Sequence, residues 1–199
     1  MNGRSELVIR QRNLGVLAAL AALFLLPVVL SFWIYYGTGW RPTGRVNYGS
    51  LIAPARPLPA VALPEAEQGT PASPFHEKWT LVYVGDGRCD AACQEALQMI
   101  RQTRLLLTHD MTRLQRVFLA TGQCCAREFL GRAHPGLIVL NATGSAAAPL
   151  LATFPANERE HTVFVVDPLG NLMMSYDARQ NPRGLLLDLQ KLLRLSHIG

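Results

Sequence analysis

The chain has 199 residues, which suits one domain of ordinary size and an additional segment. Its 19 Lys and Arg residues outnumber its 14 Asp and Glu residues, giving a formal net charge of +5. The basic residues are scattered, without a basic run or interleaved aromatics, which argues against nucleic-acid binding. The sequence also contains no P-loop, Ser/His/Asp set or metalloprotease helix, which argues against the enzyme classes that use these motifs.

The first predicted element is a membrane-spanning helix over residues 14–36, a stretch of 23 residues without a charge. At about 1.5 Å per residue it reaches roughly 34 Å, enough to cross a hydrocarbon core of about 30 Å. A cleaved signal peptide is the alternative, but its apolar core is normally about 7–15 residues and ends at a small-residue site. The stretch here is longer and runs into Tyr-Tyr-Gly-Thr-Gly-Trp, which favours a retained anchor.

Charges around this span indicate its orientation. Three arginines precede it and favour an inside N-terminus, although two arginines follow it closely. We therefore expect a cytoplasmic tail over residues 1–13 and a single-pass anchor in the inner (cytoplasmic) membrane. The C-terminal domain is then expected on the periplasmic side.

Residues 37–75 are rich in Pro, Gly and Ala. Because Pro fixes the backbone and removes hydrogen-bond donors, this composition predicts an extended tether, with one short strand around Ala60–Leu63. The globular domain is expected over residues 76–199.

The globular part reads as alternating strands and helices. An apolar strand at Trp79–Val84 leads into a helix at 91–108, for which Asp90 is the expected N-cap. A closing helix follows Asn181 and Pro182, which suit a cap and a first turn. Further strands are expected at Leu114–Ala120, Leu137–Leu140, Thr162–Asp167 and Leu172–Tyr176, and further helices at Cys124–Arg132 and Ser145–Phe154. This order predicts an α/β fold of the thioredoxin-like type.

Cys89 and Cys93 lie where the first strand meets its helix. Their spacing places both sulfurs near the helix N-terminus, where unpaired N–H groups favour thiolate, and Arg88 is expected to add to that positive field. His161 precedes a later strand. Two thiolates and an imidazole are a soft set of ligands that suits Cu(I), and Cu(II) with one further ligand.

Spacing alone leaves other interpretations open. The Cys-x₃-Cys pair could form a disulfide or be two buried residues, and a lone histidine is more often a surface residue than a ligand. Cys124 and Cys125 read as buried or incidental thiols, because a disulfide between neighbours is strained. Their functional alternative is a second thiol pair that exchanges with Cys89 and Cys93.

Two stretches resemble the SCO/SenC family, whose members are membrane-tethered, thioredoxin-like copper proteins of cytochrome c oxidase assembly. EKWTLVYVGDGRCDAACQEALQMI is similar to the strand-to-helix turn that carries that family's Cys-x₃-Cys pair. EHTVFVVDPLGNLMMSYD is similar to its segment with a third copper ligand, a His followed by a strand and a hairpin. The resemblance implies that Cys89, Cys93 and His161 are copper ligands in a divergent member.

The same resemblance implies a function. It predicts a membrane-anchored, metallochaperone-like factor, rather than an enzyme, whose partner is a cytochrome c oxidase subunit or another copper chaperone. One alternative is a thiol–disulfide oxidoreductase with Cys89 and Cys93 as catalytic residues, although such enzymes mostly use Cys-x-x-Cys. Another is a docking factor in oxidase assembly that binds no metal.

Overall fold

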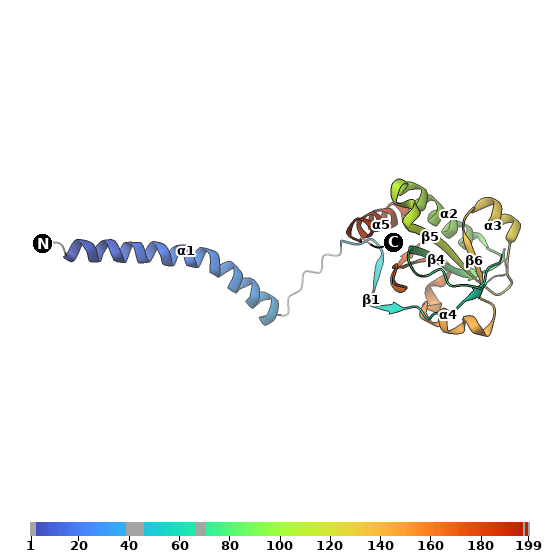
Figure 1. Ribbon diagram of the computed structural model, residues 1–199, viewed down its shortest axis with the longest axis horizontal. Coiled ribbons are helices and arrows are strands. Elements are labelled where there is room, and N and C mark those ends of the chain that lie inside the picture. The colour runs from blue at the N-terminus through green and yellow to red at the C-terminus, as the bar shows by residue number, and fades with distance from the viewer. Residues whose placement is uncertain (1–2, 39–45, 67–70, 197, 199) are drawn as a thin grey trace. The chain divides into compact units, whose positions relative to one another are not determined.

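The structure is a computed structural model that describes residues 3–38, 46–66, 71–196 and 198. The chain divides into two compact units, Met1–Arg45 and Val46–Gly199. Each unit is described by itself (Figure 1).

The first unit consists of one helix, α1, over Gly3–Gly37. Its segment Asn13–Gly37 has a mean hydropathy of 2.6 and is long and apolar enough to cross a membrane once. Pro27 lies inside the helix, a position that a membrane helix tolerates better than a soluble one. The helix begins well before residue 14, so it includes most of the stretch expected as a tail.

The second unit is built on a six-stranded mixed sheet with the order β1-β8-β7-β4-β5-β6. The strands β4, β5 and β6 are parallel to one another, whereas β7, β8 and β1 continue the sheet with antiparallel pairing. The strands span Ser50–Pro57 (β1), Trp79–Asp86 (β4), Leu114–Thr121 (β5), Ile138–Asn141 (β6), Thr162–Val166 (β7) and Asn171–Asp177 (β8). A parallel core with an antiparallel extension is the arrangement of a thioredoxin-like sheet.

Helices cover both faces of this sheet (Figure 1). Alternate residues of β4 point to opposite sides: Leu81 and Tyr83 join one core cluster, and Val82 and Val84 join the other. The first cluster packs under α2, α3 and α5, which span Ala91–Leu106, Arg127–Ala133 and Pro182–Leu195. The second packs under α4, which spans Ala148–Thr153. The central strands are mostly apolar because both of their faces are buried, although β5 also buries Arg116.

The capping residues expected from the sequence are confirmed. The Asp90 carboxylate accepts a hydrogen bond from the backbone N–H of Cys93, and the Asn181 side chain accepts one from that of Arg183. Short 3₁₀ helices also occur at Thr108–Arg113 (η1), Ser145–Ala147 (η2) and Ala156–His161 (η3).

The segment expected as a tether differs most from its prediction. The folded unit begins at Val46 rather than residue 76, because β1 pairs with β8 as an edge strand. Leu58, Leu63 and Phe75 are buried in the second core cluster. The strand expected around Ala60–Leu63 is a two-residue strand, β2 (Leu63–Pro64), paired with β3 (Pro71–Ala72). Pro is tolerated on edge strands, so the Pro-rich composition did not exclude one here.

Candidate functional site

The turn between β4 and α2 brings Cys89 and Cys93 together. They form a disulfide with a Cα–Cα distance of 5.0 Å, so the disulfide interpretation is the state observed. The backbone N–H of Cys89 donates to the Asp86 carbonyl at 3.1 Å, which closes the turn. Cys89 has a φ of +54°, a left-handed conformation that costs a residue with a side chain about 1–3 kcal/mol and clusters at functional sites.

Polar groups around the helix N-terminus hold this turn in place. The Asp90 carboxylate lies 3.0 Å from the backbone nitrogen of Cys93, which satisfies one of the helix's unpaired donors. The Gln94 side chain donates to the Cys89 carbonyl at 3.1 Å. The first bond holds the backbone of Cys93 and the second holds the backbone of Cys89, so each cysteine is fixed by one of them.

The contribution expected of Arg88 is not observed. Its guanidinium pairs with Asp86 at 3.0 Å, and its side chain is 74% exposed. Most of its charge is therefore matched by a neighbouring carboxylate and screened by solvent instead of acting on the sulfurs. The backbone N–H of Arg88, its guanidinium and the backbone N–H of Gln123 together hold the pKa of Asp86 below its ordinary value.

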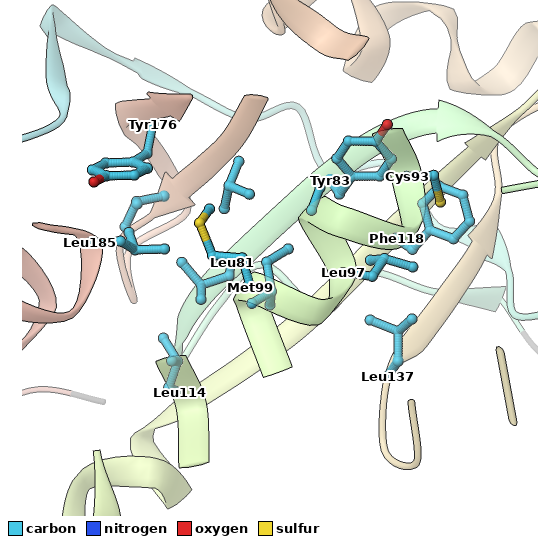
Figure 2. Packing of buried hydrophobic residues seen from close by; sticks show 14 of the residues in the cluster. Leu81, Tyr83, Cys93, Leu97, Met99, Leu114, Phe118, Leu137, Tyr176 and Leu185 are labelled. Atoms are coloured by element: carbon cyan, nitrogen blue, oxygen red, sulfur yellow. The ribbon is translucent and has the colours of Figure 1, made fainter. Parts of the chain in front are cut away.

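Tyr83 links this turn to the segment before His161. Its hydroxyl group donates to the Glu160 carbonyl at 2.9 Å, and its ring is buried against Phe118 with a centroid distance of 5.7 Å. Figure 2 shows Tyr83, Cys93 and Phe118 at the same end of the core cluster. Burial raises the pKa of Tyr83, and the charges of Asp90 and Glu160 raise it further.

Sequence reasoning did not select Tyr83. The one local sign of its unusual position is Gly85, two residues later in the chain. A Cβ at Gly85 would lie 2.7 Å from the Tyr83 ring. The bare backbone of Gly85 therefore makes room for the ring.

His161 is the last residue of η3 and is half-buried. This helix contacts both α2 and β4, the two elements that the cysteine turn connects. The backbone carbonyl of His161 accepts a hydrogen bond from Ala178 at 2.6 Å, which ties η3 to the end of β8. His161 also lines an open cleft whose other polar residues include Tyr48, Glu158, Glu160, Asp177 and Arg179.

The structure thus unites two of the three predicted ligands in a covalent bond and places the third on an adjoining element. Within the residues that the structure describes, no group of three or more His, Cys, Asp or Glu side chains is arranged to hold a metal ion. This matches the chemistry of the oxidised pair, since thiolate and not disulfide sulfur is the metal ligand.

Cys124 and Cys125 were expected as free thiols, and this prediction is wrong for the observed state. The two sulfurs are bonded to each other. The reason lies in the local backbone: α3 begins at Arg127 rather than Cys124, so the pair is in the irregular segment before the helix. Both residues are half-buried and pack against the core cluster that contains Cys89 and Cys93.

Solved structures share this fold. The apo Sco1 protein of Thermus thermophilus is 22% identical, with a TM-score of 0.59 over 76% of this chain and 99% of its own. Yeast Sco1 with copper bound is 16% identical, with a TM-score of 0.56 over 77% and 96%. A DsbF homologue from Corynebacterium diphtheriae is 14% identical, with a TM-score of 0.54 over 79% and 97%. These likenesses establish a thioredoxin-like fold.

No curated protein matches the chain in sequence. One family model does match: "Transmembrane-like, thioredoxin-like, C-terminal domain", over residues 79–196. That range runs from the start of β4 to the residue after α5 and includes both cysteine pairs and His161. The chain therefore belongs to the family of transmembrane-like, thioredoxin-like C-terminal domains.

Proposed function

We propose that this protein is a membrane-anchored copper-binding factor of the SCO/SenC type. Its cargo site consists of Cys89 and Cys93, once reduced, and His161. The observation that carries the proposal is the buried cysteine pair at a capped helix N-terminus in a thioredoxin-like unit. The likeness to Sco1, solved from yeast with copper bound, supports the same assignment.

The cysteine turn fits a soft metal ion. With Cα atoms 5.0 Å apart, the two sulfurs stay close together after the disulfide is reduced. Both side chains are almost fully buried, and backbone N–H groups at the start of α2 stabilise thiolate there. A pair of thiolates in an apolar surrounding favours Cu(I) over hard cations such as Mg²⁺ or Ca²⁺.

His161 supplies the third ligand in this proposal. Its half-buried position leaves the imidazole accessible, and the contact of η3 with α2, the helix that carries Cys93, supports this assignment. The Tyr83 hydroxyl group holds the neighbouring carbonyl of Glu160. The ring of His161 is thus carried by a segment that is anchored to the same strand that leads into Cys89.

The observed disulfide makes copper binding dependent on redox state. While Cys89 and Cys93 are bonded to each other, neither sulfur is a thiolate and no copper is held. Reduction by two electrons generates the ligands. The oxidised chain is therefore the empty form of the factor, and reduction is the step that prepares it for loading.

The proposed location is the inner membrane, with the second unit on the periplasmic side. The arginines that precede the apolar segment Asn13–Gly37 and the presence of disulfides, which persist in oxidising compartments, support this side of the membrane. The proposed partner is a cytochrome c oxidase subunit or another copper chaperone, which would exchange Cu(I) with this site.

The test is the copper content of the full-length chain in detergent after anaerobic reduction, Cu(I) loading and removal of weakly bound metal. We expect about one copper ion per unsubstituted chain and almost none in Cys89→Ala or Cys93→Ala, because one thiolate is too few soft ligands. His161→Ala should retain copper with weaker affinity. His109→Ala, which removes an exposed histidine from η1, is the matched control and should bind as the unsubstituted chain does. Equal copper in all five proteins refutes the proposal.

A second candidate function is thiol–disulfide oxidoreductase. The disulfide at the N-terminus of α2 and the likeness to the DsbF homologue favour it. This function needs both cysteines but not His161. If disulfide exchange with a reduced test protein proceeds equally fast in His161→Ala and copper binding is absent, the oxidoreductase is the better description. Oxidase assembly that tolerates loss of both cysteines would instead indicate the docking factor.

A further inference from the structure

The two disulfides lie on loops that are hydrogen-bonded to each other. The backbone N–H of Gly87, two residues before Cys89, donates to the Thr121 carbonyl at 3.0 Å. The Gly87 carbonyl accepts from the N–H of Ala126, the residue after Cys125, at 2.8 Å. Gly87 is therefore held from both ends of the segment that carries Cys124 and Cys125.

Side-chain contacts tighten the same junction. The Asp86 carboxylate accepts from the backbone N–H of Arg88 at 2.9 Å and also from the backbone N–H of Gln123. A Cβ on Gly87 would lie 2.7 Å from the Cα of Cys124, so this approach is open only to glycine. One cysteine of each pair thus lies within two residues of a direct backbone contact between the loops.

The two pairs differ in their access to solvent. Cys89 is 3% exposed and Cys93 is 1% exposed, whereas Cys124 and Cys125 are both half-buried and pack against the edge of the same cluster. Thiol–disulfide exchange requires a thiolate to approach a sulfur directly. A bulky reductant therefore meets Cys124–Cys125 first, and the inner disulfide is shielded by the fold.

We propose that Cys124 and Cys125 form an internal relay that reduces the Cys89–Cys93 disulfide. In the first step an external dithiol, either a small molecule or a protein, reduces Cys124–Cys125 and is itself oxidised to a disulfide. In the second step a thiolate of this outer pair attacks a sulfur of the inner disulfide. That attack forms a mixed disulfide between the loops and releases the other inner sulfur as a thiolate.

The remaining outer thiolate then attacks the mixed disulfide. The Cys124–Cys125 bond forms again, and Cys89 and Cys93 are left as two thiols. Two electrons move from the outer pair to the inner pair, and the two protons of the outer thiols are taken up by the inner ones. The only co-reactant is the external dithiol of the first step.

This relay goes beyond the proposed copper binding and is separable from it. It concerns how the inner pair becomes reduced, not what that pair holds afterwards. After full chemical reduction, the Cys124→Ser/Cys125→Ser chain should bind copper as the unsubstituted chain does. Loss of copper binding in Cys89→Ala tests the proposed function, and the rate of reduction tests the relay.

The experiment uses the oxidised full-length chain in detergent without metal. A limited amount of a protein dithiol is added, samples are quenched with acid, and thiols are alkylated in denaturant for mass spectrometry. We expect label on Cys124 and Cys125 first and on Cys89 and Cys93 later. In Cys124→Ser/Cys125→Ser the inner disulfide should be reduced at least tenfold more slowly. The control is Arg127→Ser, which changes an exposed side chain two residues after Cys125. Its inner disulfide should be reduced at the same rate as in the unsubstituted chain.

Two results overturn the relay. One is an unchanged rate of inner reduction in the folded Cys124→Ser/Cys125→Ser chain. The other needs no substitution: label that reaches Cys89 and Cys93 before Cys124 and Cys125. A second test uses variants that keep one cysteine of the inner pair and one of the outer pair, which gives four combinations. Under mild oxidation, at least one of these variants should form the mixed disulfide. If none forms it, the sulfurs cannot meet and the relay is wrong.

Discussion

The Tyr83 hydroxyl group lies 2.9 Å from the Glu160 carbonyl oxygen and joins the strand before Cys89 to the residue before His161. In sequence these two residues are 77 positions apart. The bond is partly buried, and Tyr83 lies at the same end of the core cluster as Cys93 (Figure 2). It therefore couples the segment of the proposed third ligand to the strand that positions the first two.

Tyr83→Phe removes this bond and keeps the ring. We expect a loss of about 1 kcal/mol in the free energy of unfolding, the usual contribution of one hydrogen bond, together with weaker Cu(I) binding. Competition with a chelator measures the affinity, and denaturant unfolding measures the stability. Tyr176→Phe is the matched control, because that hydroxyl group also donates to a backbone carbonyl, of Asn181, at the other end of the cluster. Equal effects of both changes on copper affinity would show that Tyr83 has no positioning role.

Asp90→Ala removes the cap of α2. A lost N-cap costs about 1 kcal/mol, and here it also frees the backbone N–H of Cys93. We expect reduced stability and a lower copper affinity. Asn181→Ala removes the corresponding cap of α5 and should cost similar stability with no change in copper affinity. If the two variants bind copper alike, the cap does not position the cysteine turn.

Gly87→Ala tests the close approach of the two cysteine loops. Its Cβ would lie 2.7 Å from the Cα of Cys124, and because backbone gives way poorly, we expect a loss of about 1–3 kcal/mol in stability. Gly144→Ala is the control: no atom lies within 4 Å of its Cβ, and its φ of −85° suits any residue. Thermal unfolding monitored by near-ultraviolet circular dichroism compares them. If Gly87→Ala does not lower the stability, the two loops can move apart without destabilising the fold.

The burial of His134 leads us to expect that the stability depends on pH. Its side chain is buried, and burial, followed by the charges of Arg116 and Arg101, lowers its pKa below the ordinary value of 6.5. Folding thus disfavours its protonated form. The stability is complete above pH 6.5 and declines as the pH falls from 6.5 towards the lower pKa of the folded state.

His134→Gln should flatten this decline, and His109→Gln, which changes an exposed histidine, should leave it intact. Denaturant midpoints at several pH values between 7.5 and 5 provide the measurement. A decline that persists unchanged in His134→Gln would assign the acid sensitivity to other groups.

Local signals in the sequence predicted much of this structure. The apolar runs identified the central strands, and the capping residues Asp90 and Asn181 located the two long helices of the second unit, because these depend on neighbouring residues alone. The spacing of Cys89 and Cys93 likewise placed them at a helix N-terminus. The helix that is long and apolar enough to cross a membrane was evident from its length and lack of charge.

Features that depend on distant residues were missed. Pairing of β1 with β8 joins segments more than 100 residues apart, so a Pro-rich stretch read as a tether. The ion pair of Arg88 with Asp86 is an exception: it is local, and it was overlooked when Arg88 was assigned to the field of the sulfurs. The role of Tyr83 rests on Glu160, and the closeness of the two disulfides rests on the packing of Gly87 against Cys124. These relationships arise only when the sheet is assembled.

The most direct test of the copper assignment is X-ray absorption at the copper edge on the reduced, Cu(I)-loaded full-length chain. The account predicts two sulfur scatterers and one nitrogen scatterer per copper, at about the 2.0–2.3 Å typical of such bonds. In His161→Ala the nitrogen should be lost and both sulfurs kept, whereas His109→Ala should be unchanged. A spectrum of the unsubstituted chain without sulfur, or one that is identical in His161→Ala, would contradict the proposed site.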